Sequence, residues 1–273
     1  MSGNSLLLPP EPLPLYPGEA PGLTEVDQQE VPTIIPFLLR EPTCPGCVIV
    51  CPGGGYSCRA PHEADPIAQR FNAAGISACV CHYRVAPYRY PRPQQDAQRA
   101  IRWVRSQAAE WNLDPQQIAI LGFSAGGHLV STVGTHYDAG NPEADDPVER
   151  LSCRPDALIL CYPVISFGQF RHTGTMKNLI GENPPEDLRQ SLSNETQVTA
   201  DTPPTFLWHT AEDGGVPVEN SLLFAEALSR NKVPFELHVY PHGQHGLGLA
   251  PQFPHVATWA GLCCEWLHGM WDR

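Results

Sequence analysis

The chain has 273 residues and a formal net charge of −12, with 17 Lys and Arg residues against 29 Asp and Glu residues. A surface with this excess of negative charge repels nucleic-acid phosphates and anionic membranes, so we expect neither as a partner. No stretch approaches the roughly 20 apolar residues of a membrane span. A hydrophobic content of 42% over this length is sufficient for one large core.

The ten cysteines indicate a reducing environment rather than a disulfide framework. Several lie within apolar runs, where an unpaired cysteine behaves as a small hydrophobic residue. Cys44 and Cys47 are two residues apart, but no second Cys or His pair follows at the spacing of a zinc site. The N-terminus has no basic region before its short run of leucines, so no secretory signal is recognised. We therefore predict a cytoplasmic protein without a bound metal or other cofactor.

Short apolar runs alternate with segments of helical periodicity after a proline-rich surface arm at residues 1–30. Expected strands cover residues 31–39, 47–51, 76–83, 118–121, 157–164, 205–210 and 235–240. Expected helices cover residues 64–74, 93–111, 126–135, 218–230 and 254–271. This order predicts a single α/β domain over residues 31–273, with a mostly parallel, doubly wound sheet and helices on both faces.

Two segments depart from this alternation. Prolines at positions 32 and 36 indicate that the strand at residues 31–39 lies at an edge of the sheet. Residues 165–202 contain scattered Gly, Pro and polar residues with only short helical patches. This segment is long for a connection, so we interpret it as an insertion or lid.

The motif Gly-x-Ser-x-Gly at residues 122–126 lies between an expected strand and an expected helix. A serine at the apex of such a turn is typical of a nucleophile elbow. The five letters alone also fit a glycine-rich turn without chemistry, so the assignment of Ser124 depends on its partners. A serine hydroxyl becomes nucleophilic when a histidine accepts its proton and a carboxylate orients that histidine.

The expected partners follow in the order acid and then histidine, each after a strand. Asp213 follows the strand at residues 205–210 and precedes a glycine turn, which favours it over its neighbour Glu212. His245 lies further beyond the strand at residues 235–240 than His242 and is therefore preferred. His209 falls within a strand and His128 in the first helical turns, so both are interpreted as core histidines.

Acyl transfer also requires N–H donors that bind the oxyanion of the tetrahedral intermediate. One donor is expected from Ala125, directly after the nucleophile, and the second from the loop after an earlier strand. The run Pro-Gly-Gly-Gly-Tyr at residues 52–56 has that position, and it offers Gly54 or Gly55 as the donor. Glycine at these positions lets the backbone approach a substrate closely.

Five motifs together resemble an α/β-hydrolase of the esterase/lipase group, and within it the small bacterial acetylxylan esterase-like proteins. They are residues 52–56, His-Tyr-Arg-Val-Ala-Pro at 82–87, Asp96 with residues 99–105, Gly-Phe-Ser-Ala-Gly-Gly-His at 122–128, and His-Thr-Ala-Glu-Asp at 209–213. The resemblance extends from about residue 12 to the C-terminus. It implies a Ser124–His245–Asp213 catalytic triad and an oxyanion hole from Gly54 or Gly55 with Ala125. The hormone-sensitive-lipase branch has a histidine where this chain has Pro52, which places the chain beside that branch.

The resemblance implies a serine esterase for short acyl groups, above all acetyl groups on a carbohydrate alcohol, with a small-molecule ester as the binding partner. Tyr56, Phe167 and Phe170 either stack on sugar rings or pack within the lid. A serine peptidase and a formamidase-like amidase share the fold and the triad, although such peptidases usually carry a second, gating domain. A non-catalytic binding protein of this fold would be expected to have lost a triad member.

Overall fold

The computed structural model describes residues 5–22 and 31–271 of the chain. Within them, eight strands form one sheet in the order β1-β2-β4-β3-β5-β6-β7-β8. The strands are β1 (Leu13–Pro14), β2 (Thr33–Phe37), β3 (Cys47–Cys51), β4 (Ser77–His82), β5 (Ile118–Phe123), β6 (Ala157–Cys161), β7 (Thr205–Thr210) and β8 (Phe235–Tyr240). All pairs from β4 to β8 in this order are parallel, whereas the pairs β1–β2 and β2–β4 are antiparallel. The predicted, mostly parallel sheet is therefore confirmed.

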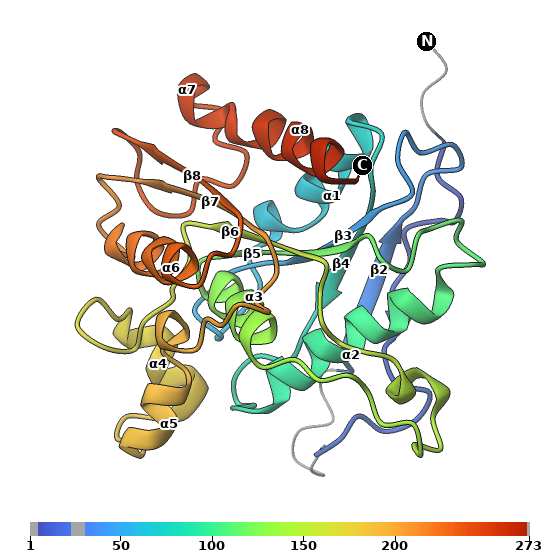
Figure 1. The fold of residues 1–273 in the computed structure, drawn as a ribbon, viewed down its shortest axis with the longest axis horizontal. Coiled ribbons are helices and arrows are strands. Elements are labelled where there is room, and N and C mark those ends of the chain that lie inside the picture. The colour runs from blue at the N-terminus through green and yellow to red at the C-terminus, as the bar shows by residue number, and fades with distance from the viewer. Residues whose placement is uncertain (1–4, 23–30, 272–273) are drawn as a thin grey trace.

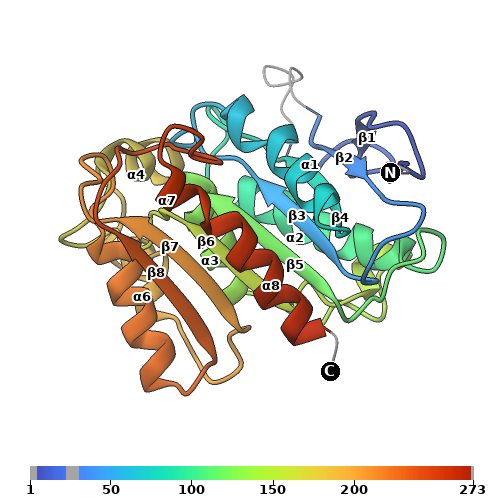
Figure 2. The ribbon, with the colours of Figure 1, turned by 90° about the horizontal axis from the view of Figure 1, so that it is seen from above.

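Helices cover both faces of this sheet, as Figure 1 and Figure 2 show. One face carries α1 (Asp65–Ala73), α7 (Pro254–Ala257) and α8 (Trp259–Trp271), and the other carries α2 (Arg92–Gln107), α3 (Ala125–Thr135) and α6 (Glu219–Arg230). The segment at residues 165–202 contains α4 (Thr173–Ile180) and α5 (Glu186–Ser191), which lie beyond α3 and α6 (Figure 1). No helix within the described residues is long and apolar enough to cross a membrane.

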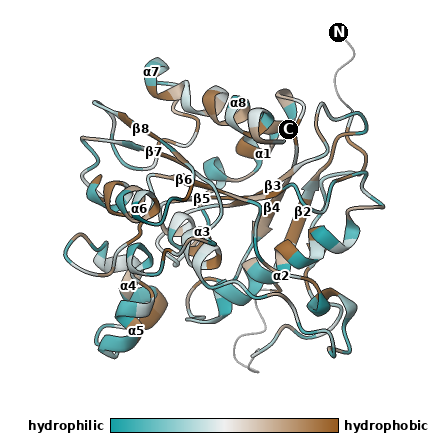
Figure 3. Ribbon diagram, viewed as in Figure 1, coloured by the Kyte–Doolittle hydropathy of each residue, from teal (hydrophilic) through white to brown (hydrophobic). Residues whose placement is uncertain are grey.

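The central strands are buried on both faces, because each lies between two layers of helices. Every residue of β3, β5, β6 and β7 is buried, which explains their continuous apolar sequences. Figure 3 shows this hydrophobic character along the strands and the mixed character of α2. In α2, Ala97, Ala100, Ile101 and Val104 face the core at helical spacing, as predicted.

The N-terminal arm and the closing helix differ from the sequence-based expectation. Leu13 and Pro14 form β1, which pairs with β2, so the edge position predicted for residues 31–39 belongs to β1 instead. Residues 1–4 and 23–30 of the expected arm lie outside the described residues.

The expected helix at residues 254–271 is divided at Thr258, whose hydroxyl donates to the His255 carbonyl at 2.6 Å. Such a local side-chain bond competes with the regular helix.

The strand order reverses direction between β3 and β5. From β3 the chain passes through α1 to β4 on one side, and α2 then carries it back to β5 on the other side of β3. Cys51 at the end of β3 lies opposite Gly122 of β5. Loops that leave the carboxyl ends of two strands at such a reversal diverge and leave a crevice where ligands bind. The glycine turn and the nucleophile motif therefore lie side by side at this point.

Candidate active site

Ser124 occupies a strained turn between β5 and α3. Its backbone angles are φ 52° and ψ −117°, a conformation that side-chain-bearing residues rarely adopt. The Ser124 N–H donates to the Cys161 carbonyl at 3.0 Å, and its own carbonyl accepts from the Val164 N–H at 3.0 Å. These two bonds to the segment that begins at the end of β6 hold the strained residue in place.

The glycines on either side of Ser124 are required by close backbone contacts. A Cβ on Gly122 would overlap the carbonyl of Gly126, and a Cβ on Gly126 would overlap the carbonyl of Cys51. The helix thus starts directly against the end of β3. This proximity brings the glycine turn that follows β3 to the side of Ser124.

The structure brings Ser124, His245 and Asp213 together at the carboxyl edge of the sheet. The Ser124 Oγ lies 2.8 Å from His245 Nε2, and His245 Nδ1 lies 2.7 Å from Asp213 Oδ2. Because a carboxylate only accepts, Nδ1 of the neutral imidazole carries the proton and Nε2 is free to accept from the serine hydroxyl. Glu212 and His242 instead pair with each other at 2.8 Å on the surface.

The Asp213 carboxylate is held ionised by several donors. Its Oδ1 accepts from the N–H groups of Gly215 and Val216 at 2.9 and 2.8 Å, and His209 Nε2 lies 3.4 Å from its Oδ2. Burial alone would raise the pKa of this carboxyl, but the hydrogen bonds from His209, His245 and Val216 outweigh it and hold the pKa well below its usual range. Asp213 therefore stays charged and keeps His245 oriented at neutral pH.

His209 is the buried core histidine that its place in a strand predicts. Its Nδ1 lies 2.8 Å from the Ser221 hydroxyl, and its Nε2 lies 3.0 Å from the Val216 carbonyl. Both ring nitrogens thus have partners, and the additional contact with Asp213 helps to hold that carboxylate in place.

The glycine turn presents unbonded N–H groups beside Ser124. The Gly53 N–H donates to the buried carboxylate of Glu63 at 2.8 Å, so this donor is occupied. The N–H groups of Gly54 and Gly55 have no acceptor among the described residues, and the positive φ values of 127° and 64° explain why glycine occupies both positions. Ala125 is the first residue of α3, where a helix amide has no intrahelical acceptor. The predicted oxyanion-hole residues therefore lie on both sides of the serine.

Tyr56 does not offer its ring to a substrate. It is 1% exposed, and its hydroxyl lies 3.0 Å from His128 Nδ1. The His128 ring stacks on Phe167 with 4.3 Å between centroids, and its Nε2 lies 2.9 Å from the Leu192 carbonyl. Because all three rings are buried, the substrate-stacking role expected of Tyr56 is corrected to packing between the glycine turn, α3 and the insertion. Phe167 packs in the same way, whereas Phe170 is partly exposed.

The buried His128 ring is held in its neutral form. Burial lowers the pKa of His128 to about 4, although the bond to the Leu192 carbonyl opposes this shift. A neutral ring with both nitrogens bonded has no proton to exchange with a substrate. This environment agrees with the structural role expected of His128.

His172 in the insertion lies near the candidate site, which the sequence did not indicate. Its pKa is lowered first by burial and then by the charge of His245, and the charge of Asp213 also acts on it. Its Nδ1 accepts from the Thr175 N–H at 3.2 Å and thereby caps α4. From the same helix, Asn178 donates to the Gly55 carbonyl at 2.8 Å. The insertion is thus attached to the glycine turn.

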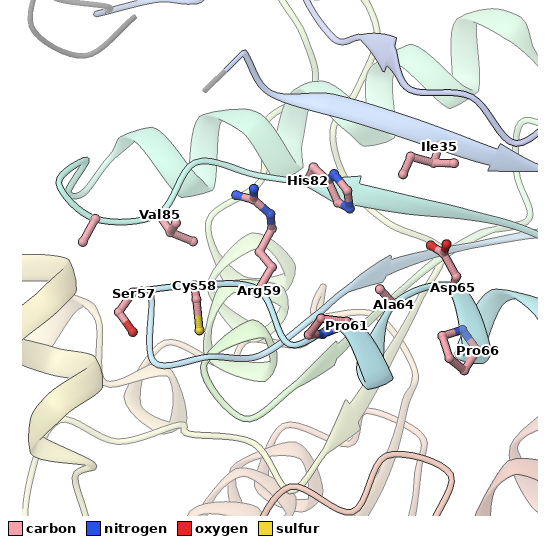
Figure 4. Close-up of a pocket in the computed structure, with 11 residues that line it drawn as sticks. Ile35, Ser57, Cys58, Arg59, Pro61, Ala64, Asp65, Pro66, His82 and Val85 are labelled. Carbon is pink, nitrogen blue, oxygen red and sulfur yellow. The ribbon is translucent and has the colours of Figure 1, made fainter. Parts of the chain in front are cut away.

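A separate pocket of about 620 Å³ lies beyond the glycine turn (Figure 4). Ser57, Arg59, Asp65 and His82 are among its lining residues, and Ser124, Asp213 and His245 are not. Figure 4 shows these side chains around the space between the loop after Tyr56 and the end of β4. This pocket is therefore separate from the group formed by Ser124, His245 and Asp213.

Within residues 5–22 and 31–271, no group of three or more His, Cys, Asp or Glu side chains is arranged to hold a metal ion. The described cysteines form no disulfide.

Comparison with known proteins identifies relatives over most of the chain. A protein-family model described as BD-FAE matches residues 40–228. The solved structure of an acetyl ester-xyloside bifunctional hydrolase from Caldicellulosiruptor lactoaceticus is 51% identical, with a TM-score of 0.94, and the match covers 97% of this chain and 98% of that one. The strand order and such structural relatives confirm the predicted α/β-hydrolase fold.

Two curated relatives are longer proteins. Endo-1,4-beta-xylanase B of Butyrivibrio fibrisolvens is 39% identical over 227 residues, which are 81% of this chain and 35% of that protein. An acetylxylan esterase of Xylanibacter ruminicola is 32% identical over 212 residues, which are 76% of this chain and 42% of that protein. The chain thus spans less than half the length of these two relatives.

Proposed function

Because the chain belongs to the BD-FAE family, we propose that it is a carboxylic ester hydrolase with Ser124 as the nucleophile. The observation that carries this proposal is the pair of hydrogen bonds, 2.8 and 2.7 Å long, that links Ser124 through His245 to Asp213. A relative named as an acetylxylan esterase and a relative named as an acetyl ester-xyloside bifunctional hydrolase support the same reaction class.

The reaction proceeds in two steps through an acyl-enzyme. His245 Nε2 accepts the proton of the Ser124 hydroxyl while Oγ attacks the ester carbonyl. The resulting imidazolium is stabilised by Asp213, and it donates its proton to the leaving alcohol. Water then attacks the acyl group, again with His245 as the base, and releases the carboxylic acid. Asp213 holds the imidazole tautomer throughout both steps.

The tetrahedral oxyanion is stabilised by backbone amides. The Ala125 N–H approaches it from the start of α3, where the helix dipole also favours negative charge. Gly54 or Gly55 supplies the second donor, since the neighbouring Gly53 N–H is bonded to Glu63. Removal of one such donor typically costs about 3 kcal/mol in transition-state stabilisation.

Two of the relatives are named for acetyl esters or acetylxylan, and their names support a proposal for the substrate class. We infer that the enzyme removes short acyl groups, above all acetyl, from carbohydrate alcohols. The peptidase and amidase readings find no support among these names. A non-catalytic binding protein would have no reason to retain a complete, hydrogen-bonded triad.

A substrate series tests the proposal. Purified protein is assayed on 4-nitrophenyl esters from acetate to decanoate and on acetylated xylo-oligosaccharides, beside an aminopeptidase substrate and a formanilide. We expect the highest kcat/KM on the shortest esters and release of acetate from the oligosaccharides. Preferential turnover of the amide or peptide substrates would contradict the proposed function.

A further inference from the structure

A buried carboxylate lies directly behind the glycine turn. Glu63 belongs to the short helical turn Pro61–Glu63 and is 2% exposed. Transfer of a carboxylate from water into a protein interior is strongly unfavourable unless donors replace its hydration. The Glu63 side chain is held by two buried donors, since Oε2 accepts from the Gly53 N–H at 2.8 Å and Oε1 accepts from the Tyr162 hydroxyl at 2.6 Å.

The first of these bonds fixes the wall of the site next to the nucleophile. A Cβ on Gly53 would lie 2.7 Å from Glu63 Oε2 and 3.0 Å from the Ser124 Cβ. Gly53 is therefore enclosed between the Glu63 carboxylate and the serine. Because the Gly53 N–H points to Glu63, the orientation of the Pro52–Gly53 peptide group is set. The next amide in the chain, that of Gly54, has no acceptor in the described part of the chain.

The second bond reaches the loop that carries His245. Tyr162 donates to Glu63, and its oxygen accepts from the Gly248 N–H at 2.8 Å. The Tyr162 ring contacts the His245 imidazole edge-on, with 5.1 Å between centroids. Burial raises the pKa of Tyr162 well above its usual value, and the Glu63 charge adds to this, so the hydroxyl stays a donor.

We propose that Glu63 is a positioning residue that couples the oxyanion-side turn at Gly53 to the Tyr162–His245 side of the same site. This inference rests on the proposed ester hydrolysis. A carboxylate suits this position because the Gly53 N–H and the Tyr162 hydroxyl both donate to it, and His62 Nε2 lies 3.6 Å from Oε1. The amide of a glutamine offers only one acceptor oxygen, so either the Gly53 N–H or the Tyr162 hydroxyl would face an NH₂ group.

The consequence is a loss in the transition state rather than in substrate binding. Small displacements of an oxyanion donor weaken bonds that form fully only with the tetrahedral intermediate. For Glu63→Gln we expect kcat on 4-nitrophenyl acetate to fall by about 10- to 100-fold with KM changed by less than about twofold. The affinity for an aryl trifluoromethyl ketone, which forms a tetrahedral adduct with the serine, should fall by a similar factor.

Asp156→Asn is the control for the loss of a carboxylate that accepts from a backbone N–H, although the Asp156 side chain is half-buried whereas Glu63 is fully buried. Asp156 accepts from the Ile118 N–H at 2.9 Å and from Arg105 at 3.0 Å. It thus supports the start of β5, whereas Glu63 acts near its end. We expect this variant to lose thermal stability but to retain the wild-type kcat and ketone affinity. A role of Glu63 in stability alone would make the two variants alike.

Tyr162→Phe separates the two bonds of Glu63, since it removes the hydroxyl and retains the ring against His245. We expect a smaller fall in kcat and in ketone affinity than for Glu63→Gln. A folded Glu63→Gln protein with wild-type kcat and ketone affinity would overturn the proposal. If that variant does not fold, unchanged kcat and ketone affinity in Tyr162→Phe would overturn it. In the same assay, an inactive wild type or an active Ser124→Ala variant would overturn the proposed function itself and this inference with it.

Discussion

The hydroxyl of Ser124 and the imidazole of His245 are joined by a 2.8 Å hydrogen bond across 121 positions of the chain. Ser124 follows β5 and His245 follows β8, with β6 and β7 between them in the sheet. Because these four strands are parallel, the loops at their carboxyl ends share one edge. The sheet therefore brings the proposed nucleophile and its proposed base together, although they lie far apart in the sequence.

Substitution of the acidic member should remove most of the activity. In Asp213→Asn the side chain no longer stabilises the imidazolium, and its NH₂ group favours the wrong His245 tautomer. We expect kcat to fall by roughly 10³- to 10⁴-fold. Steady-state kinetics on 4-nitrophenyl acetate measure this loss. The adjacent Glu212→Gln serves as control, because Glu212 pairs with His242 on the surface. Similar losses in both variants would contradict the assignment.

Neighbouring glycines of the turn should differ in their tolerance of alanine. A Cβ on Gly54 would overlap the Cys58 carbonyl, whereas the nearest atom to a Cβ on Gly55 is 3.9 Å away on Asn178. Gly54→Ala should therefore displace the turn and lower kcat by about 100-fold. Gly55→Ala carries only the strain of a positive φ, about 1–2 kcal/mol. Kinetics and thermal unfolding of both variants test this prediction. A larger loss of kcat in Gly55→Ala than in Gly54→Ala would contradict it.

The buried neutral His128 should make the fold sensitive to mild acid. Its folded-state pKa of about 4 lies below the ordinary value of 6.5. Between these values the unfolded chain binds a proton that the folded chain does not. The contribution of His128 to the free energy of unfolding is therefore complete above about pH 6.5. It is lost as the pH falls toward 4, by up to about 1.4 kcal/mol per pH unit.

Urea unfolding of wild type and His128→Gln across this pH window isolates the contribution. Subtraction of the two curves removes other titrating groups, including His136, whose pKa burial also lowers. The difference in free energy of unfolding should shrink as the pH is lowered. A difference that stays constant between pH 7 and pH 4 would contradict a neutral, buried His128.

His172 should matter for the alcohol portion of the substrate rather than for the chemical step. Because Nδ1 accepts from the Thr175 N–H, the neutral ring presents Nε2–H as a donor. His172→Asn retains the ability to cap α4 and removes the imidazole. We expect a several-fold higher KM for acetylated xylo-oligosaccharides, with kinetics on 4-nitrophenyl acetate unchanged. Equal effects on both substrates would place His172 outside substrate recognition.

The parts of the fold that sequence predicted well are those with strong local signals. Strands β3, β7 and β8 begin and end where the continuous apolar or alternating runs do. Helix α4 was not expected, because its cap is the imidazole of His172 rather than one of the Ser, Thr, Asp or Asn side chains that usually mark a helix start. The pairing of β1 depends on contacts with a strand twenty residues later, which no local pattern reveals.

In the candidate site, too, the residues with a local sequence signal could be predicted, whereas contacts between distant parts of the chain could not. Ser124, Asp213 and His245 each follow a strand and carry chemistry in their residue type, so order and spacing indicate them. The burial of Tyr56 depends on His128 and Phe167 from other parts of the chain. Likewise, nothing around Glu63 in sequence predicts its partners, because Gly53 and Tyr162 converge on it only in the folded sheet.

The central claim, that Ser124 is the activated nucleophile, is tested most directly by covalent labelling with a fluorophosphonate. Intact-mass analysis and peptide mapping of wild type, Ser124→Ala and His245→Ala follow the stoichiometry and the site of labelling. We predict one label per wild-type chain, at Ser124, none in Ser124→Ala, and labelling slowed by orders of magnitude in His245→Ala. A wild-type chain that remains unlabelled, or a Ser124→Ala variant that still hydrolyses 4-nitrophenyl acetate at the wild-type rate, would contradict the account.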